Sequence, residues 1–376
     1  MNVAFAAGGT GGHINPALAI ADKLKEVFPD TNILFIGSPD GLEAKLVKKA
    51  GYDFASVKMA GIQRKLTPHN IKLNIQAVHY YLSAGKRIKK IFDDFSPDLV
   101  IGTGGYVTGT VLKTAIKCGI KTALHESNSL PGVSVKMLAP KADLVMLGTE
   151  DAKKHLEAKN EVIVTGLPVR GELLNARKDL SRKKLGIPNN KYLVLSFGGS
   201  LGAKPLNDAM YDILLESAEN DTYYHIHSVG TNGSEFLDKF KEQGFTEGEK
   251  GLIKGNVEVR QYIDDMDTCM SACDLVIGRA GASSLSEIEA MGKASILIPS
   301  PYVAENHQFH NAMALVNRGA GSIIEEKDLT SQSLKEAIDS MLSNPAKLIQ
   351  IEENAKNMAI TDARERIADI IISLAK

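Results

Sequence analysis

The residues best suited to chemistry lie near the start of the chain, in the stretch VAFAAGGTGGHINPALAIADKL. An apolar run ends at a turn that holds four glycines, and His13 follows that turn directly. Asn15 is a good helix N-cap and Pro16 suits a first helical position, so we expect a helix from about Pro16. A glycine-rich turn lets backbone N–H groups approach a ligand, and a helix N-terminus favours an anion. The pattern predicts an anion-binding turn with a histidine beside it. A plain strand-to-helix turn is the alternative.

Polar segments also follow other apolar runs. In the first half, GTGGYVTG (102–109) follows DLVI, and LHESN (124–128) ends another run. In the second half, one run ends at Arg279, and the small residues Ala282, Ser283 and Ser284 then begin a helix whose N–H groups would be open. Glu287 lies one turn further along, where a carboxylate can accept two hydrogen bonds from the diol of a ribose. The alternative for Glu287 is a carboxylate that complements the helix dipole.

Side-chain amides form a second candidate group in ENHQFHNA (305–312). Gln308 and Asn311 are three residues apart and share one helix face. Amides in this arrangement suit the hydroxyls of a sugar, and ordinary surface residues are the alternative.

Two patterns resemble metal sites, and neither is accepted as one. Asp265-Met266-Asp267 matches the D-x-D of some sugar-nucleotide transferases, but it stands where a helix should start. Asp264 or Asp265 as an N-cap, with acid in the first turn, explains the pattern better. His307 and His310 have the spacing of a metal pair, yet no further ligand is placed with them. We therefore expect no metal site and no cofactor.

A nicotinamide dehydrogenase and a P-loop NTPase are the first rival functions, and the turns fit neither. A G-x-G-x-x-G fingerprint counted from Gly9 would need glycine where Ile14 stands, and counted from Gly198 it would need glycine at Ser200. The second apolar run, NILFIG, ends without the carboxylate that grips a ribose, and no G-K-[ST] closes either turn.

Short β-rich runs alternate with helical patterns along the whole chain, which indicates βαβ units and parallel sheets. Both halves open with a strand, a glycine-rich turn and a helix, and the polar segment GLPVRGELLNARKDLSRKKLGIP lies between them. The sequence thus predicts an α/β protein with two doubly wound, Rossmann-like domains facing each other across a cleft. Strands are expected at 3–6, 33–36, 99–101, 122–125, 144–147, 162–165, 193–196, 224–228, 257–260, 275–277, 295–297 and 322–324, and C-terminal helices at about 330–342, 345–358 and 362–375.

Composition excludes several classes of protein. The 376 residues carry a net charge of −1, which does not suit a nucleic-acid binder, and the three cysteines do not form a disulfide framework. The first residues lack the pattern of a signal peptide, and no run of 18 apolar residues occurs. We expect a soluble or membrane-peripheral protein of the cytoplasm.

One segment departs from this neutral composition. Residues 61–92 hold seven Lys or Arg, at positions 64, 65, 72, 86, 87, 89 and 90. Ile71, Ile75, Val78 and Leu82 recur in the same segment at helical spacing. A basic amphipathic segment is typical of contact with anionic lipid, and an ordinary helix with its apolar face in the core is the alternative.

Taken in order, the motifs GGTGGH, GTGGYVTG, LHESN, GLPVR, GGSLGA, YIDDM, RAGASSLSE and NHQ…NA resemble the MurG family of bacterial N-acetylglucosaminyltransferases. The resemblance spans residues 8 to 312 and implies the GT-B architecture. It implies an inverting hexosyltransferase that moves GlcNAc from UDP-GlcNAc to the C4 hydroxyl of MurNAc in lipid I, forming lipid II. It also implies a role in peptidoglycan and cell-wall synthesis, cell shape and cell division, at the cytoplasmic face of the membrane.

The resemblance implies a domain division and a set of substrate contacts. Residues 1–166 would form the acceptor and membrane-facing domain, with a C-terminal helix at about 360–376 packed back onto it, and residues 167–359 the UDP-GlcNAc domain. Ser200 would lie beside the diphosphate, Ile263 would read the uracil through its backbone, Glu287 would bind the ribose, and Gln308 would read the GlcNAc hydroxyls. The family often has two adjacent glutamines where this chain has His307-Gln308. Further substrate contacts are Thr10, Gly11, Gly12, Asn128, Arg170, Ala282, Ser283, Ser284, Leu285 and Ser286.

The expected mechanism is a single in-line displacement in which His13 is the candidate general base. A helix N-terminus keeps an imidazole neutral, as a base requires. A purely positioning role for His13 is the alternative. With no metal, the GGSLGA backbone, the helix start at Ala282 and Arg279 or Arg170 would stabilise the leaving UDP. Rival functions are another GT-B enzyme, including an epimerase, and a non-catalytic binding module.

Overall fold

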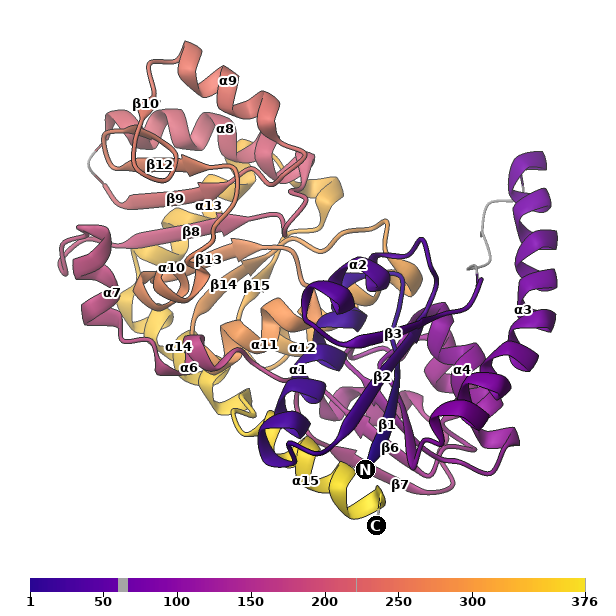
Figure 1. The fold of residues 1–376 in the computed structure, drawn as a ribbon. Coiled ribbons are helices and arrows are strands. Elements are labelled where there is room, and N and C mark those ends of the chain that lie inside the picture. The colour runs from indigo at the N-terminus through magenta and orange to yellow at the C-terminus, as the bar shows by residue number, and fades with distance from the viewer. Residues whose placement is uncertain (60–66, 221, 376) are drawn as a thin grey trace. The chain divides into compact units, whose positions relative to one another are not determined.

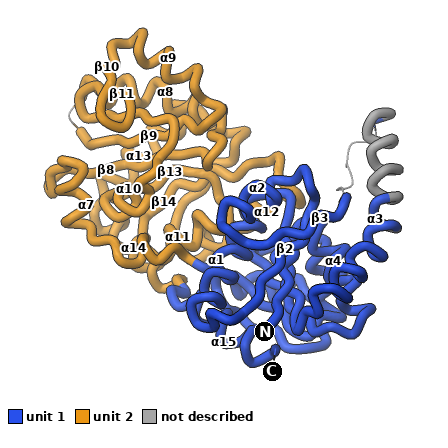
Figure 2. Tube along the Cα trace, viewed as in Figure 1, with its two compact units in different colours: residues 1–168, 360–376 blue, residues 169–359 orange. Residues whose placement is uncertain are grey.

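The computed structural model describes residues 1–59, 67–220 and 222–375, with the backbone alone for residues 68–79, 81 and 82. The chain divides into two compact units, which are described separately below (Figure 2). Unit 1 comprises residues 1–168 and 360–376, and unit 2 comprises residues 169–359.

Unit 1 is built on a seven-stranded parallel sheet with the order β3-β2-β1-β4-β5-β6-β7 (Figure 1). The strand order reverses between β1 and β4, which pair in register from Val3 opposite Leu99 to Ala6 opposite Gly102. Such a switch point is where open α/β sheets bind their ligands. The strands are β1 (Asn2–Ala6), β2 (Asn32–Gly37), β3 (Asp53–Ser56), β4 (Leu99–Gly102), β5 (Lys121–Glu126), β6 (Leu144–Leu147) and β7 (Glu161–Val164).

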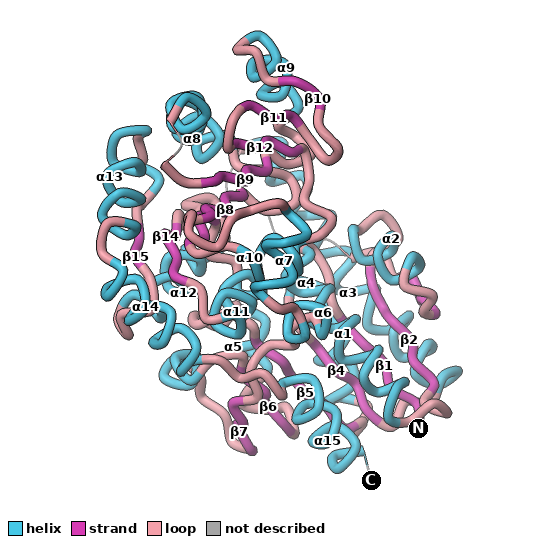
Figure 3. Tube along the Cα trace, turned by 90° about the vertical axis from the view of Figure 1, so that its left-hand side faces the viewer, coloured by secondary structure: helices cyan, strands magenta, loops and turns pink. Residues whose placement is uncertain are grey.

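Helices cover both faces of this sheet, and each face has its own apolar core. One core joins the sheet to α3, α4 and α5, and the other joins it to α1, α2 and the C-terminal helix α15 (Figure 3). Ile367, Ala368 and Ile371 of α15 are fully buried there, so the last helix of the chain completes unit 1. The helices are α1 (Gly11–Val27), α2 (Leu42–Lys49), α3 (Pro68–Phe95), α4 (Gly105–Lys117), α5 (Val133–Leu138), α15 (Ala363–Ala375) and the 3-10 helix η1 (Glu150–His155).

Unit 2 repeats the design on an eight-stranded sheet with the order β10-β11-β12-β9-β8-β13-β14-β15. Here the order reverses between β8 and β13, and only the β10-β11-β12 edge is antiparallel. The strands are β8 (Leu193–Phe197), β9 (Tyr224–Ser228), β10 (Thr246–Glu247), β11 (Leu252–Lys254), β12 (Val257–Arg260), β13 (Leu275–Gly278), β14 (Ala294–Leu297) and β15 (Ser322–Ile323). The helices are α6 (Gly171–Asn175), α7 (Lys178–Leu185), α8 (Lys204–Glu219), α9 (Ser234–Glu242), α10 (Met266–Ala272), α11 (Ala282–Met291), α12 (His307–Val316), α13 (Ser331–Leu342) and α14 (Pro345–Met358), with 3-10 helices η2 (Ala304–Asn306) and η3 (Glu326–Asp328).

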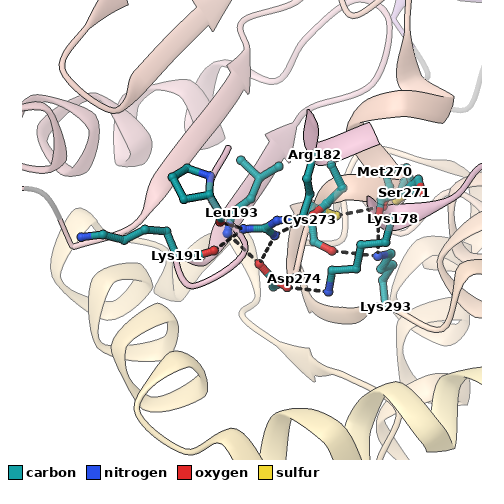
Figure 4. Close-up of polar contacts among 11 residues, drawn as sticks. Lys178, Arg182, Lys191, Leu193, Met270, Ser271, Cys273, Asp274 and Lys293 are labelled. Atoms are coloured by element: carbon teal, nitrogen blue, oxygen red, sulfur yellow. Dashed lines mark hydrogen bonds and ion pairs between the residues drawn. The ribbon is translucent and has the colours of Figure 1, made fainter. Parts of the chain in front are cut away.

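A buried ionic cluster lies at the amino ends of β8 and β13 in unit 2 (Figure 4). The Asp274 carboxylate accepts hydrogen bonds from the Leu193 N–H (2.7 Å), from Lys178 (2.6 Å) and from Arg182 (3.1 Å). Arg182 also donates to the carbonyls of Pro188, Lys191 and Ala272. Because these carbonyls and Asp274 lie in separate segments, the cluster fastens α7 to the sheet.

The α/β architecture and every strand expected from the sequence are confirmed, as are the three C-terminal helices. The short strands β3, β10 and β11 were not expected, because none of them contains a long apolar run. The expected start of the first helix was wrong. Thr10, not Asn15, is the N-cap, and Pro16 lies inside a helix that begins at Gly11.

Contacts along the chain explain this earlier helix start. The N–H groups of His13 and Ile14 bond to the Thr10 carbonyl, and the Thr103 hydroxyl donates to the His13 carbonyl at 2.7 Å. Tertiary contacts of this kind override the low helix propensity of two glycines. His13 consequently lies in the first turn of α1.

The basic segment 61–92 is only partly covered by the structure. Residues 61–66 and the side chains of Ile71, Ile75, Val78 and Leu82 lie outside the described residues. In the described end of α3, Ile88 and Phe92 are buried in the core, and the four basic residues are exposed. This end of α3 packs on the core with its basic residues exposed, and the choice between the two alternatives stays a prediction. Within the described parts of the chain, we find no helix with the length and apolar character needed to cross a membrane.

Candidate active site

In unit 1 the two glycine-rich turns meet at the switch point of the sheet. One follows β1 and the other follows β4, and these strands are neighbours. Gly105 has φ +82°, and a Cβ there would lie 2.1 Å from the Gly8 carbonyl oxygen. Gly104 has φ +113°, and its Cβ would lie 2.6 Å from Cδ2 of His13. Glycine at both positions lets the second turn pack against the first turn and the histidine ring.

The His13 ring is held in one orientation by the turn before it. Its Nδ1 lies 3.1 Å from the Gly8 carbonyl oxygen and 3.3 Å from the Thr10 hydroxyl. Because a carbonyl can only accept, we assign the ring hydrogen to Nδ1, which leaves the lone pair on Nε2. Burial lowers the pKa of His13, and the bond to Gly8 opposes that shift only in part. His13 thus has the protonation state of a base at neutral pH.

The start of α1 offers open donors beside this histidine. In the described part of the chain, the N–H groups of Gly11 and Gly12 have no hydrogen-bond partner, and Gly12 is exposed. The side chain of Thr10, the N-cap residue, makes no capping hydrogen bond. Two open N–H groups at a helix N-terminus form an anion-binding arrangement.

The end of β5 is organised by a carboxylate whose role the sequence analysis missed. Glu126 is 4% exposed and accepts from the Asn128 N–H (2.9 Å), the Asn128 amide (3.0 Å) and the Gly132 N–H (2.8 Å). It thereby fixes the orientation of Asn128. His125, beside it, is fully buried against the Gly166 carbonyl, and burial lowers its pKa to about 4.

In unit 2 the start of α11 resembles the start of α1. The Leu285 N–H bonds to the Gly281 carbonyl, whereas the N–H groups of Ala282, Ser283 and Ser284 have no partner among the described residues. The N-cap residue here is Gly281, which has no side chain to cap the helix. The arrangement suits a phosphate group. Leu285 is buried in the core, and Ser286 is half-buried.

Two predicted donor contacts are brought together here. The Nε of Arg170 lies 2.8 Å from a Glu287 carboxylate oxygen, although the residues are 117 positions apart in sequence. Glu287 follows the open N–H groups of α11 by one helical turn, so the ion pair lies one turn along the helix from them.

The GGSLGA turn follows β8, the strand beside β13, so it lies at the same switch point as α11. Gly202 has φ +84°, and a Cβ there would lie 2.1 Å from the Val229 carbonyl oxygen. Ser200 is exposed, and its carbonyl accepts from the Thr231 N–H at 3.1 Å. The turn is thereby held against the loop after β9 with Ser200 outward.

In the YIDDM segment, the backbone groups of Ile263 and of the residues on either side of it are open among the described residues. Ile263 is 4% exposed, and neither its N–H nor its C=O is bonded to another residue that the structure describes. Such a backbone pair can read a base edge. Asp265 occupies the N-cap position of α10, but its side chain does not cap the helix and instead pairs with Arg260 (2.7 Å) and Lys250 (2.5 Å). Asp265 thus occupies the expected N-cap position, but ion pairs hold its carboxylate in place of the expected capping hydrogen bond.

The remaining candidates already have partners within unit 2. Arg279 pairs with Glu326 and donates to the Ile298 carbonyl at 3.1 Å. The Gln308 side-chain oxygen accepts from the Ser300 N–H at 2.9 Å. Asn311 is buried and donates to the Ala280 carbonyl at 3.2 Å, so it supports the start of α11 rather than facing a ligand. No group of three or more His, Cys, Asp or Glu residues suited to a metal occurs within the described ranges.

Two doubly wound α/β units, each with glycine-rich turns at its switch point, form the architecture of GT-B glycosyltransferases. Models of the glycosyltransferase family 28 N-terminal and C-terminal domains match residues 3–147 and 193–368. A UDP-N-acetylglucosamine–N-acetylmuramyl-(pentapeptide) pyrophosphoryl-undecaprenol N-acetylglucosamine transferase of Acetivibrio thermocellus is 42% identical over all of this chain and 99% of its own length. One of the same name from Caldanaerobacter subterraneus subsp. tengcongensis is 41% identical over 99% of each chain.

Solved structures agree with these sequence comparisons. The crystal structure of Acinetobacter baumannii MurG matches with a TM-score of 0.79 and 25% identity over 99% of both chains. The chain therefore belongs to glycosyltransferase family 28, and within it to the MurG family of N-acetylglucosaminyltransferases.

Proposed function

We propose that this protein transfers GlcNAc from UDP-GlcNAc to the C4 hydroxyl of MurNAc in lipid I, with inversion, and so forms the lipid II of peptidoglycan synthesis. The observation that carries the proposal is identity of 41–42% over essentially the whole chain to transferases named for this reaction. The site chemistry agrees, because both glycine-rich switch points offer donors to phosphate groups.

The donor would bind to unit 2. The open N–H groups at the start of α11 and the Ser200 turn would hold the diphosphate, and the unpaired backbone of Ile263 would read the uracil. Glu287 would accept from the ribose hydroxyls, and its ion pair with Arg170 would fix the carboxylate for that task. Gln308 would read the GlcNAc hydroxyls through its amide. In unit 1 we propose Thr10, Gly11, Gly12 and Asn128 as the other contacts.

His13 would act as the general base. Its Nε2 lone pair would take the proton of the C4 hydroxyl as that oxygen attacks the anomeric carbon, while UDP leaves from the opposite side. The backbone donors at Ser200 and α11 would stabilise the charge that develops on UDP. Arg170 and Arg279 would add to this field, each already oriented by an ion pair, with Glu287 and Glu326 respectively. We propose that this field replaces a metal ion in the reaction.

The decisive experiment measures UDP release from UDP-GlcNAc with and without a soluble lipid I analogue. We expect UDP and a disaccharide product with the inverted linkage only when the acceptor is present, at an undiminished rate in excess chelator. Turnover of the donor alone would indicate an epimerase or hydrolase, and binding without turnover a non-catalytic module. Complete loss of single-turnover transfer in chelator would contradict metal-independent chemistry.

We also propose that the protein acts as a peripheral protein at the cytoplasmic face of the membrane, in support of cell shape and division. The exposed Lys86, Arg87, Lys89 and Lys90 of α3 support contact with anionic lipid. We expect co-sedimentation with vesicles that contain anionic lipid, weakening as salt rises. Equal binding to neutral vesicles at all salt concentrations would contradict this contact.

A further inference from the structure

A buried carboxylate lies behind the first glycine-rich turn. Glu43, on α2, is 1% exposed. One of its oxygens accepts from the Gly9 N–H at 3.3 Å, and the other accepts from the Ser38 N–H at 3.1 Å and from the Tyr106 hydroxyl at 3.3 Å. Burial and the nearby carboxylate raise the pKa of Tyr106 to about 12, so its hydroxyl keeps the proton that it donates.

Glycines make the space that this carboxylate occupies. A Cβ on Gly8 would lie 3.0 Å from a Glu43 oxygen, a Cβ on Gly37 would lie 2.6 Å from its Cγ, and a Cβ on Gly41 would lie 2.3 Å from an oxygen. Three glycines from two segments, the turn after β1 and the stretch from the end of β2 to α2, thus leave out a side chain at one point. Burying a charge is costly unless it is well hydrogen-bonded, so a carboxylate built in this way calls for a function.

The Gly8–Gly9 peptide group connects this carboxylate to the histidine. Its N–H donates to Glu43, and its carbonyl oxygen accepts from Nδ1–H of His13 at 3.1 Å. Hydrogen bonds at the two ends of one peptide group polarise each other in the same direction. The negative charge therefore strengthens the carbonyl as an acceptor and stabilises a proton on the imidazole.

We propose that Glu43 is a positioning residue for His13, acting through the Gly8–Gly9 peptide to hold the ring in its Nδ1–H tautomer and to make Nε2 more basic. The arrangement does through a peptide what a carboxylate does directly in a Ser-His-Asp triad. This inference rests on the proposed role of His13 as the base.

Replacement of Glu43 by glutamine has a predictable sign. The amide keeps the shape of the side chain but loses the charge, and its single oxygen can accept either from Gly9 or from Ser38 and Tyr106, not from both sides. The titratable groups that these contacts place around the turn are Glu43 on α2 and Tyr106 on α4. With Glu43 neutral, the imidazole binds a proton less tightly, so the acid limb of the rate profile, where His13 becomes protonated, moves to lower pH.

The test is the pH dependence of kcat/KM for the acceptor in Glu43→Gln. We expect a fall of about tenfold at neutral pH, an acid limb lower by roughly half a pH unit, and an unchanged KM for UDP-GlcNAc. Asp143→Asn is the control. Asp143 also accepts from a backbone N–H, that of Thr122 at 2.7 Å, but it lies at the amino ends of β5 and β6, away from the glycine-rich turns. The control should match the wild type in both rate and limb.

Two further measurements separate this inference from simpler outcomes. In a His13→Ala background, Glu43→Gln should cost nothing more, since the two residues act as one unit. Nitrogen-15 NMR of the wild-type ring should show the proton on Nδ1, a result that does not depend on the variant folding. An unmoved acid limb, or the proton on Nε2, overturns the inference. Either of these results leaves the proposed function intact, provided that the wild-type protein transfers GlcNAc and His13→Ala does not.

Discussion

Replacement of His13 by alanine is expected to lower kcat/KM for the acceptor by about 10²–10⁴-fold, the usual contribution of a positioned general base. The ring sits in the first turn of α1 with its Nδ1 bound to the Gly8 carbonyl, so Nε2 is the atom able to take a proton. Burial lowers the pKa of His13 and keeps the base neutral at physiological pH. Steady-state kinetics with a lipid I analogue measures the effect.

UDP binding shows whether His13→Ala impairs catalysis alone or also donor binding. The proposed uridine and diphosphate contacts belong to unit 2, so His13→Ala should bind UDP with wild-type affinity in calorimetry. His155→Ala is the matched control, since His155 is an exposed histidine of unit 1 on η1. It should retain wild-type kinetics. A decrease of less than about tenfold in His13→Ala would end the general-base assignment and leave His13 a positioning role.

The sequence was a good guide wherever local pattern decides structure. Apolar runs between glycine-rich turns predict the strands, and the carboxyl ends of parallel strands predict where polar groups gather. The turns at Gly8–Gly12 and at Gly198–Gly202 accordingly lie at the two switch points. The first helix was misplaced because Asn15 and Pro16 form a good local start signal, whereas contacts from Thr10 and Thr103 decide the real start.

Contacts between residues that are distant in sequence could not be predicted from local sequence patterns. Arg170 and Glu287 were both candidate donor contacts, but nothing in their sequence neighbourhoods shows that they pair. Glu43 lies in the first turn of α2, two residues after Gly41, and its contact with Gly9 spans 34 residues. One signal was available in retrospect: Gly37 and Gly41 flank the turn before Glu43, and both make room for it.

In unit 2 the two ends of the parallel strands carry different kinds of contact. The Ser200 turn and the N–H groups of α11 that lack a partner among the described residues lie at the carboxyl ends of β8 and β13. The amino ends of the same strands hold the ionic cluster of Arg182 and Asp274. Because the ionic cluster fixes the amino ends of these strands, their carboxyl ends can carry backbone donors that are left open for a ligand.

Replacement of Asp274 by alanine is therefore expected to lower the free energy of unfolding of unit 2 by about 3–5 kcal/mol, the usual cost of removing one partner from a buried ion pair. The change leaves Arg182, which is 3% exposed, without its counter-ion, and it leaves the Leu193 N–H without an acceptor (Figure 4). Urea unfolding followed by circular dichroism measures the loss. The transition of unit 2 is the one that UDP shifts to higher urea.

An exposed ion pair of the same unit gives the matched control. Asp208 pairs with Lys204 at 3.2 Å on α8, and the two side chains are 51% and 66% exposed. Asp208→Ala should cost about 0.2–1 kcal/mol, because solvent screens such a pair and either charge remains hydrated when left alone. If Asp274→Ala cost no more than this control, the cluster would not be what fastens α7 to the sheet. A large loss confined to Asp274→Ala, with UDP affinity retained in the folded protein, is the result that the contacts predict.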